Sequence, residues 1–317
     1  MNKNLLKNTI TFEDNSVLQL VCGIYHANLH LIEKKLNVSL TPKGNEISIK
    51  GNTENILITK NTLLKLYERA KLTDIIEKND IKSIISFMED HNEKEKKTNN
   101  LEKIYIETQA KKIFPHSKGQ LNFIKSLTEK ELIFAIGPAG TGKTFLAVSY
   151  AVSLLIVGKI DKIIISRPAV EAGEKLGFLP GDLKQKIDPY LRPIYDALHE
   201  NLPYQKVLKL IENEKIEIAP IAYMRGRTLN NCYIILDEAQ NTSAVQMKMF
   251  LTRLGINSKM VVTGDLTQID LPNKKNSGLL DAEKSLKKIK NISFIYLSEK
   301  DVVRHPLVSE IIKAYEK

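Results

Sequence analysis

At 317 residues, the chain is long enough to form one large domain or two modest domains with real cores. Its hydrophobic content of 43% and charged content of 26% are ordinary for a soluble globular protein. The net charge of +10, from 47 basic and 37 acidic residues, favours a polyanionic partner, although a lysine- and asparagine-rich composition can also reflect a biased genome.

Cysteine content and apolar patterning exclude other classes of protein. Cys22 and Cys232 are too isolated for a disulfide framework or a metal site, and we expect Cys232 to be a buried free thiol in a strand. Residues 1–15 lack the continuous apolar core of a secretory signal. The longest apolar helix candidate, residues 145–157, is shorter than the roughly 20 residues that span a bilayer. We therefore expect a cytoplasmic protein with no membrane partner.

Residues 1–88 are predicted to form a small α+β domain. Residues 10–22 are strand-like, and apolar residues then recur at helical spacing up to residue 36. Two segments of alternating polarity follow on either side of a turn at 42–45, and a longer helix begins near residue 56. This β-α-β-β-α order is typical of a small nucleic-acid-binding module of the KH-like kind.

The loop that such a module uses to hold a nucleic-acid backbone has the pattern G-x-x-G. The corresponding segment here, Gly23-Ile24-Tyr25-His26, retains only the first glycine, so RNA binding by this unit is an open alternative. Residues 89–103 are polar and mixed in charge, and we expect them to form a linker.

Residues 104–317 are predicted to form a larger α/β domain. Short apolar runs alternate with helical patterns, which indicates a parallel sheet buried on both faces. The expected strands are Leu132–Ile136, Lys162–Ser166, Tyr233–Leu236, Met260–Thr263 and Phe294–Leu297. Ligands bind at the carboxyl ends of the strands in sheets of this kind.

The segment between the first of these strands and the next helix fits the phosphate-binding pattern G-x-x-x-x-G-K-[ST]. Glycines allow the backbone to turn sharply and to point several N–H groups at one anion, beside the positive end of the helix dipole. We expect the lysine to be a catalytic charge on the β- and γ-phosphates and the threonine hydroxyl to bind Mg²⁺. The predicted nucleotide-binding loop comprises Gly137, Pro138, Ala139, Gly140, Thr141, Gly142, Lys143 and Thr144.

Another strand ends in two adjacent carboxylates, Asp237 and Glu238. We expect Asp237 to hold Mg²⁺, because this ion keeps several waters and takes few protein ligands. Glu238 faces a different direction and is the candidate base that polarises the water attacking the γ-phosphate. Downstream of a phosphate loop, the pair indicates hydrolysis rather than transfer to a small acceptor. The alternative is an exposed acidic pair that caps the next helix.

The next strand ends in a polar tip that contains Thr263 and Asp265. We expect both to lie beside the γ-phosphate and to sense whether it is present. Gln240 and Gln268 are candidates for orienting the attacking water or for relaying that signal, and each is equally well explained as a loop amide in solvent.

Two further candidates lie outside these strands. Gln120 precedes the phosphate loop at the place where helicase-like ATPases carry a glutamine whose amide reads the adenine edge. Arg304 follows the last strand, and its planar fork suits the charge on the γ-phosphate in the same subunit or in a neighbour. The competing arginines are Arg225, Arg227 and Arg253.

Residues 166–198 are long for a simple crossover and contain several prolines and glycines. We expect this insertion to grip a polymer or to meet a neighbouring subunit. A basic turn at 224–229 lies just before the strand that ends in Asp237.

Together, these motifs resemble those of the PhoH-like ATPase family. The motifs that carry the resemblance, in the order of the family, are G-P-A-G-T-G-K-T (137–144), R-P-A-V-E-A-G-E (167–174), L-G-F-L-P-G-D (176–182), M-R-G-R-T-L (224–229), L-D-E-A-Q-N (236–241) and T-G-D (263–265). The resemblance is close over 104–317. The N-terminal unit is similar to the KH-like domain of the family, chiefly at 28–29, 32–33 and 44–45.

The resemblance implies a RecA-like P-loop NTPase core with a parallel sheet, preceded by a small α+β KH-like domain. It also implies ATP and Mg²⁺ as cofactors, a homo-oligomeric ring and a link to RNA metabolism. In many bacteria a relative works alongside a metal-dependent endoribonuclease in ribosomal RNA maturation. RNA and an endoribonuclease or ribosome-associated protein are therefore the expected partners. ATP is favoured over GTP by Gln120 and by the resemblance, because no guanine-reading Asn-Lys-x-Asp motif is present.

The motifs support two hypotheses about function. In the first, the chain is an ATPase that couples hydrolysis to RNA binding or remodelling, in the manner of an RNA helicase. In the second, it is a nucleotide-switched adaptor that docks an endoribonuclease or ribosomal partner without unwinding a strand. A small-molecule kinase is disfavoured by the adjacent carboxylates and by the absence of a recognisable acceptor pocket.

Overall fold

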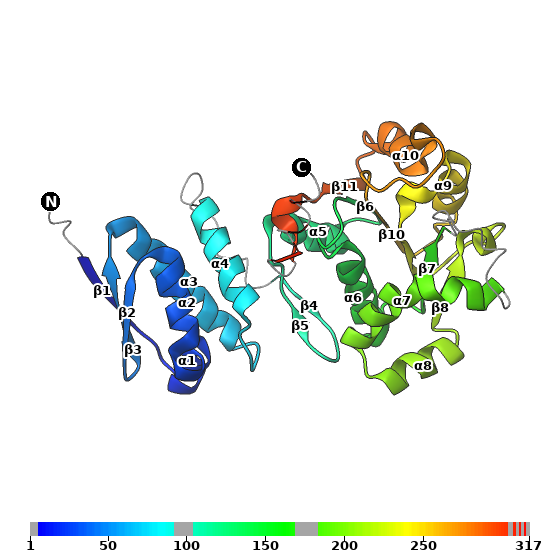
Figure 1. Cartoon of the computed structure of the whole chain (residues 1–317). Helices are drawn as coiled ribbons and strands as arrows, with labels where there is room; N and C mark the ends of the chain where they lie inside the picture. Colours follow the sequence, from blue (N-terminus) through cyan, green and yellow to red (C-terminus); the bar gives the residue numbers. More distant parts are fainter. Residues whose placement is uncertain are drawn as a thin grey trace. The chain divides into compact units, whose positions relative to one another are not determined.

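The computed structural model describes residues 6–91, 104–168 and 183–303, together with residues 307, 308, 311 and 314. The chain divides into two compact units (Figure 1). The first extends to Tyr105 and includes Phe114–Lys118, and the second consists of Ile106–Ile113 and the chain from Gly119 onward. Most of the expected linker, much of the expected insertion after Arg167, and Arg304 lie outside the described residues.

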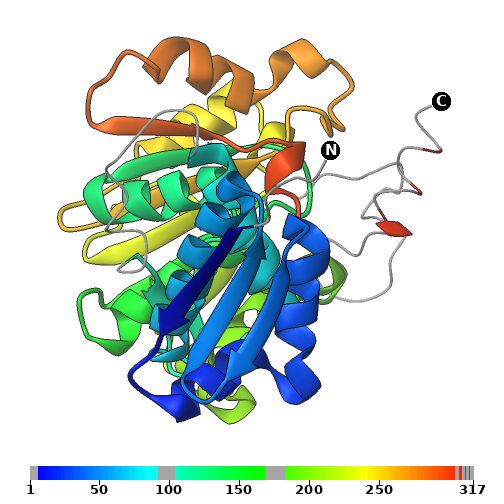
Figure 2. The same cartoon turned by 90° about the vertical axis from the view of Figure 1, so that its left-hand side faces the viewer.

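The first unit is an α+β unit with a three-stranded antiparallel sheet in the order β1-β3-β2 (Figure 2). Its elements are β1 (Leu6–Thr11), α1 (Asn15–Cys22), the 3₁₀ turn η1 (Ile24–His26), α2 (Ala27–Leu36), β2 (Ser39–Lys43), β3 (Glu46–Gly51), α3 (Thr53–Ala70) and α4 (Lys78–His91). Ile47 and Ile49 alternate with polar residues along the central strand and pack into one buried cluster with Leu29 and Ile32 of α2. The KH-like assignment stays a prediction.

The predicted strand over residues 10–22 is wrong beyond β1, because its second half is the helix α1. Asp14 begins this helix: its Oδ1 accepts hydrogen bonds from the backbone N–H groups of Ser16, at 2.7 Å, and Val17, at 3.4 Å. The buried face of the helix comprises Leu18, Val21 and Cys22. This i, i+3, i+4 spacing, combined with the cap, outweighs the strand-like composition.

The candidate G-x-x-G segment forms the tight connection between α1 and α2. Gly23, Tyr25 and His26 have φ angles of 74°, 50° and 61°. The side chains of Ile24 and Tyr25 are exposed. Tyr25 and His26 therefore adopt the left-handed backbone that favours glycine, although both carry side chains. His26 occupies the position of the second glycine in the pattern.

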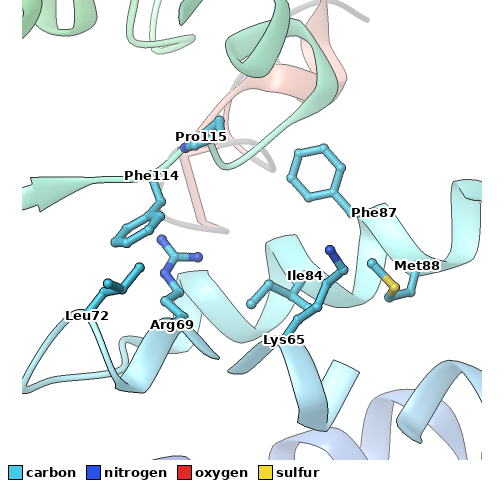
Figure 3. A pocket seen from close by; sticks show the side chains of 8 residues that line it. All are labelled: Lys65, Arg69, Leu72, Ile84, Phe87, Met88, Phe114 and Pro115. Carbon is cyan, nitrogen blue, oxygen red and sulfur yellow. The ribbon is translucent and has the colours of Figure 1, made fainter. Parts of the chain in front are cut away.

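A buried ion pair connects α3 and α4. Arg69 Nη2 lies 2.8 Å from Asp80 Oδ1, and the Arg69 guanidinium lies 4.1 Å from the ring centroid of Phe114. His116 Nδ1 is 3.1 Å from Ser83 Oγ, and burial lowers the pKa of both His116 and Arg69. A cavity of about 50 Å³ beside Arg69 (Figure 3) is lined by Lys65, Arg69, Leu72, Ile84, Phe87, Met88, Phe114 and Pro115. The segment 114–118 is thereby fixed to the first unit.

The second unit is built on a six-stranded parallel sheet in the order β11-β6-β10-β9-β7-β8. Its strands are β6 (Leu132–Ile136), β7 (Lys162–Arg167), β8 (Ile216–Pro220), β9 (Cys232–Leu236), β10 (Lys259–Gly264) and β11 (Ile292–Tyr296), and β4 (Ile106–Glu107) and β5 (Lys112–Ile113) form a separate antiparallel pair. Its helices are α5 (Lys118–Glu129), α6 (Lys143–Ile156), α7 (Leu183–Asn201), α8 (Tyr204–Glu212), α9 (Ala244–Leu251) and α10 (Gly278–Leu286), with short 3₁₀ turns η4 (Ile221–Met224), η5 (Ala239–Asn241), η6 (Lys274–Asn276) and η7 (Glu299–Asp301).

The five expected strands are confirmed to within two residues at each end, and the parallel sheet is confirmed with them. Strand β8 was not predicted. It lies at the edge of the sheet and is only partly buried, and Glu217 interrupts its apolar character. An edge strand of this kind lacks the continuous apolar run that identifies the central strands.

Helices cover both faces of this sheet. Phe134, Ile234 and Val262, from three neighbouring strands, share one buried cluster with Met247 of α9 and Leu279 of α10. Alternate residues of the strands face the opposite side, where α6 packs against β7, β9 and β10 (Figure 1). Both faces are apolar, so the polar residues at the carboxyl ends of the strands stand out as a site.

None of the helices in the described part of the chain combines the length and the apolar character needed to cross a bilayer.

Candidate nucleotide-binding site

The predicted phosphate loop connects β6 to α6 in a tight turn. Gly140 and Gly142 have φ angles of 83° and 81°, in the left-handed region that favours glycine. A Cβ atom at Gly137 would collide with the backbone oxygen of Leu297, which follows β11. The glycines are therefore required both by the turn and by the close approach of the neighbouring strand.

Lys143 is held by the loop that precedes it. Its side chain is buried, and Nζ donates to the backbone oxygens of Gly137 at 2.6 Å and Pro138 at 2.8 Å. Its charge is thus balanced by carbonyl dipoles at the mouth of the loop. To contact a phosphate, the ammonium group would exchange these carbonyls for phosphoryl oxygens.

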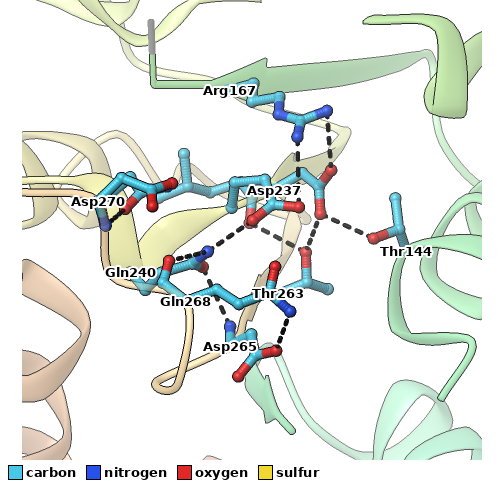
Figure 4. Close-up of polar contacts among 11 residues, drawn as sticks. Thr144, Arg167, Asp237, Gln240, Thr263, Asp265, Gln268 and Asp270 are labelled. Atoms are coloured by element: carbon cyan, nitrogen blue, oxygen red, sulfur yellow. Dashed lines mark hydrogen bonds and ion pairs between the residues drawn. The ribbon is translucent and has the colours of Figure 1, made fainter. Parts of the chain in front are cut away.

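Asp237 is the centre of a buried group of hydrogen bonds. Its Oδ1 accepts from Thr144 Oγ1 and from Thr263 Oγ1, both at 2.7 Å (Figure 4). The side chain of Asp237 is only 5% exposed. An exposed acidic pair that caps a helix is therefore the wrong description of Asp237. The predicted metal residues Asp237 and Thr144 are in direct contact, and Thr263 joins them.

Glu238 is held on both carboxylate oxygens. Oε1 lies 3.3 Å from Arg167 Nη2, and Oε2 accepts a hydrogen bond of 2.6 Å from Gln240 Nε2. The backbone of Glu238 is left-handed, with φ of 53°. A residue other than glycine adopts this conformation only where its surroundings impose it, which is common at functional sites.

Arg167 is the site residue that the sequence analysis missed. It is the last residue of β7, which pairs with β9 so that Ser166 lies opposite Leu236. Arg167 Nη1 lies 4.0 Å from Asp237 Oδ2, so its guanidinium faces both carboxylates (Figure 4). Its place after an apolar strand was a signal, but only the strand order shows that this strand neighbours β9.

The polar tip after β10 is connected to Glu238 through two glutamines. Gln240 Oε1 accepts from the Asp265 backbone N–H at 3.0 Å, and Gln240 Nε2 also lies 3.2 Å from the Gln268 backbone oxygen. Gln268 Nε2 donates to Asp265 Oδ2 at 2.8 Å. Both glutamines therefore belong to one network with Asp265. The description as a solvent amide is wrong for Gln240, which is fully buried, whereas Gln268 is exposed and joins the network from the solvent side.

The structure describes the position of Gln120 but not that of Arg304. Gln120 is buried on α5, and its Nε2 donates to the backbone oxygen of Thr141 at 3.0 Å, so the side chain lies against the phosphate loop. Its role in reading adenine stays a prediction. The Val303 backbone N–H donates to the Gly140 oxygen at 3.0 Å, which brings the described chain to the loop, but Arg304 itself lies outside the described residues.

Two of the competing arginines, Arg227 and Arg253, stabilise the framework of the second unit. Arg227 forms a forked pair with Glu217 of β8, at 2.6 and 2.9 Å, and this hydrogen bonding lowers the pKa of Glu217. Arg253 Nη1 donates to the Arg227 backbone oxygen at 2.7 Å. Arg225 is exposed after η4.

A cavity of about 240 Å³ brings these elements together. It is lined by Ala139, Gly140, Gly142, Lys143, Thr144, Phe145, Asp237, Glu238, Gly264, Asp265 and Gln268. A hydroxyl and a carboxylate in contact are the hard oxygen donors that Mg²⁺ takes, and two such ligands leave room for water and phosphate. Thr144 and Asp237 therefore fit a Mg²⁺ ion that accompanies a nucleotide.

Comparison with known proteins places the chain among its relatives. A family model described as PhoH-like protein matches residues 112–316, which is more than half of the chain. The chain belongs to the PhoH-like protein family. A PhoH-like protein of Bacillus subtilis is 50% identical over 289 residues, which cover 91% of both chains.

Other members of the family are also similar over long stretches. A PhoH-like protein of Mycobacterium bovis is 44% identical over 299 residues, which cover 93% of this chain and 84% of the relative. Protein PhoH of Escherichia coli is 45% identical over 205 residues, or 64% of this chain and 58% of the relative. These names state a family and no reaction. A solved Sulfolobus solfataricus SWI2/SNF2 ATPase core in complex with dsDNA overlaps 62% of this chain and 50% of its own at 16% identity, and its TM-score of 0.34 is too low to support an inference.

Proposed function

We propose that the chain is an ATPase that hydrolyses ATP in the cavity between the phosphate loop and the ends of β9 and β10. The observation that carries this proposal is the contact of Thr144 with buried Asp237, next to a Glu238 whose carboxylate is held in a fixed direction. Binding alone needs only the loop, whereas an oriented carboxylate beside it suits activation of water.

Each residue has a defined task in this reaction. The loop N–H groups and Lys143 bind the phosphates, and Thr144 and Asp237 hold Mg²⁺. When bound, Mg²⁺ neutralises charge that develops on the β- and γ-phosphoryl oxygens. Glu238 accepts a proton from water as the water oxygen bonds to the γ-phosphorus. The bond from that phosphorus to the β–γ bridging oxygen breaks, and ADP and inorganic phosphate leave.

Thr263, Asp265 and the two glutamines couple the γ-phosphate to the rest of the unit in this proposal. Asp265 and Glu238 are joined through Gln240, so a change at the phosphate can reach the loop after β10. Arg304 is proposed to contact the γ-phosphate in its own subunit or in a neighbour of a ring. Its position in the sequence, one residue after the Val303 contact with Gly140, supports this role.

The proposed work of the ATPase is RNA binding or remodelling in the cytoplasm, within ribosomal RNA maturation alongside an endoribonuclease. The net charge of +10 and the separate α+β unit support an RNA partner. A homo-oligomeric ring would allow an arginine to act between subunits.

The test of hydrolysis is the Glu238→Gln variant. Glutamine keeps the size of the side chain but cannot take a proton, so we expect phosphate release from ATP to fall by about 10² to 10⁴-fold while ATP still binds. The matched control is Glu212→Gln on α8, an exposed acid of the same unit, which should hydrolyse ATP at the wild-type rate. Unchanged turnover in Glu238→Gln would remove Glu238 as the base.

A further inference from the structure

We infer that Arg167 is a positioning residue for hydrolysis: it aims the Glu238 carboxylate at the attacking water without touching the nucleotide. This inference rests on the proposed ATPase function and adds to it a residue and a mode of control. The observation behind it is the pairing of one guanidinium with both Asp237 and Glu238.

The sheet fixes the position of Arg167. Strand β7 lies beside β9 in register, and the Asp237 backbone N–H donates to the Ser166 oxygen at 2.9 Å, so the ladder continues to the edge where the carboxylates lie. The Arg167 side chain is 20% exposed. An arginine on a rigid, partly buried strand end loses little freedom when it pairs, and its planar fork can face two carboxylates at once.

Arg167 and Gln240 each hold a different oxygen of the Glu238 carboxylate. Arg167 faces Oε1 from β7, and Gln240 donates to Oε2 from η5. A carboxylate has about four acceptor sites, so one partner on each oxygen leaves capacity to accept a proton from water. The two partners therefore fix the direction of the carboxylate without blocking its use as a base.

The charge of Arg167 has a second consequence. Asp237 and Glu238 are adjacent in sequence, and Oδ1 of Asp237 is already engaged by Thr144 and Thr263. The guanidinium faces Oδ2 of Asp237 and Oε1 of Glu238, so it reduces the repulsion between two neighbouring negative groups. Without this guanidinium, the Glu238 carboxylate would turn away from Asp237 and would no longer point at the attacking water.

The test compares Arg167→Ala, Arg167→Gln and Arg167→Lys with the wild type. For each variant, we would measure kcat and KM for ATP hydrolysis, and the dissociation constants of ATP and ADP. Arg227→Ala is the matched control, because it also removes an arginine paired with a carboxylate of the same sheet, away from the cavity. It should leave kcat unchanged.

We expect kcat to fall by about tenfold to a hundredfold in Arg167→Ala and Arg167→Gln, the size of effect that a misplaced catalytic group produces. KM should change little, and the ratio of ATP to ADP affinity should stay at its wild-type value. Arg167→Lys should restore part of the rate, because its point charge can pair with one carboxylate only.

Three results would overturn the inference. A wild-type kcat in both Arg167→Gln and Arg167→Ala would show that Arg167 does not orient the Glu238 carboxylate. A selective loss of ATP over ADP affinity would show that Arg167 touches the γ-phosphate itself. If the wild type does not hydrolyse ATP, or if Glu238→Gln hydrolyses it normally, the proposed function fails and this inference fails with it. Should Arg167→Ala not fold, the Arg167→Gln and Arg167→Lys variants decide the question.

Discussion

At the scale of single residues, the site is organised around one buried oxygen, Oδ1 of Asp237. Two hydroxyls donate to it, Thr144 from α6 and Thr263 from β10. Thr144 can keep this contact and bind Mg²⁺ at the same time, because a hydroxyl donates its proton to one partner and offers its oxygen lone pairs to another. Thr263 is fully buried at the end of β10, so its hydrogen bond holds Asp237 in place from the sheet.

Substitution of Thr263 by valine tests this role. Valine has the same shape but lacks the hydroxyl, so the buried carboxylate loses one of its two donors. Because hydrogen bonds to charged groups contribute about 1.5–3 kcal/mol, we expect the free energy of unfolding in urea to fall by about that amount. Thr252→Val, at an exposed position beside α9, should change it by less than about 0.5 kcal/mol. Equal effects of the two variants would contradict this account.

The residues of the phosphate loop and the Asp237-Glu238 pair could be predicted because their chemistry is written in short motifs. Arg167 could not be assigned to the site, since it meets Glu238 only through the neighbouring positions of β7 and β9. The contacts of Arg167 and Gln240 with the two carboxylate oxygens of Glu238 could not be predicted from the sequence either. They depend on a left-handed backbone and on Gln240, whose side chain contacts both Glu238 and the loop 265–268.

At the scale of elements, the first unit is joined by the buried pair of Arg69 on α3 and Asp80 on α4. Both side chains are about a tenth exposed or less. A buried charge needs a partner of opposite sign, and Arg69 also rests on the ring of Phe114. This pair therefore fixes the angle at which α4 and the segment 114–118 pack on α3.

Substitution of Asp80 by asparagine should destabilise the chain by about 3–5 kcal/mol, because it leaves the Arg69 charge buried without its partner. Asparagine still offers an oxygen to the Glu77 backbone N–H, which donates to Asp80 at 2.9 Å, so the effect reports mainly on the charge. Glu68→Gln removes an exposed pair with Lys71 and should cost about 0–1 kcal/mol. Urea unfolding measures both, and a small effect of Asp80→Asn would contradict the packing role.

Most elements of the second unit were predictable from apolar runs, because its central strands are buried on both faces. Strand β8, which is only partly buried at the edge of the sheet, was not predictable. In the first unit, α1 was hidden in a strand-like run whose cap, Asp14, outweighs composition. Local propensity is a weak signal where one capping side chain and one buried face decide the structure.

At the scale of the whole molecule, charge and modular organisation support a nucleic-acid partner. The excess of ten positive charges is spread over a chain that folds as two units, of which only the second contains the candidate nucleotide site. The division into two units is visible in the sequence as a change from α+β to α/β patterning. The strand order, which decides what meets in the cavity, is not.

RNA binding should therefore depend strongly on salt. For single-stranded RNA, we expect the logarithm of the affinity to fall linearly with the logarithm of salt concentration, by about 0.7 for each phosphate contacted. Fluorescence anisotropy over a series of salt concentrations measures this slope, and an uncharged-backbone oligomer of the same sequence is the control. RNA should also raise the rate of ATP hydrolysis. Binding that ignores salt, or hydrolysis that ignores RNA, would favour the adaptor hypothesis.

The most direct measurement is the structure of the chain with Mg²⁺ and a non-hydrolysable ATP analogue. We expect the triphosphate to occupy the cavity of about 240 Å³ and Lys143 Nζ to move from the Gly137 and Pro138 oxygens to the phosphates. We also expect the Thr144 hydroxyl oxygen to bind the metal while Thr263 keeps its hydrogen bond to Asp237. A nucleotide bound elsewhere, or a Lys143 that stays on the loop carbonyls beside a bound triphosphate, would contradict these expectations.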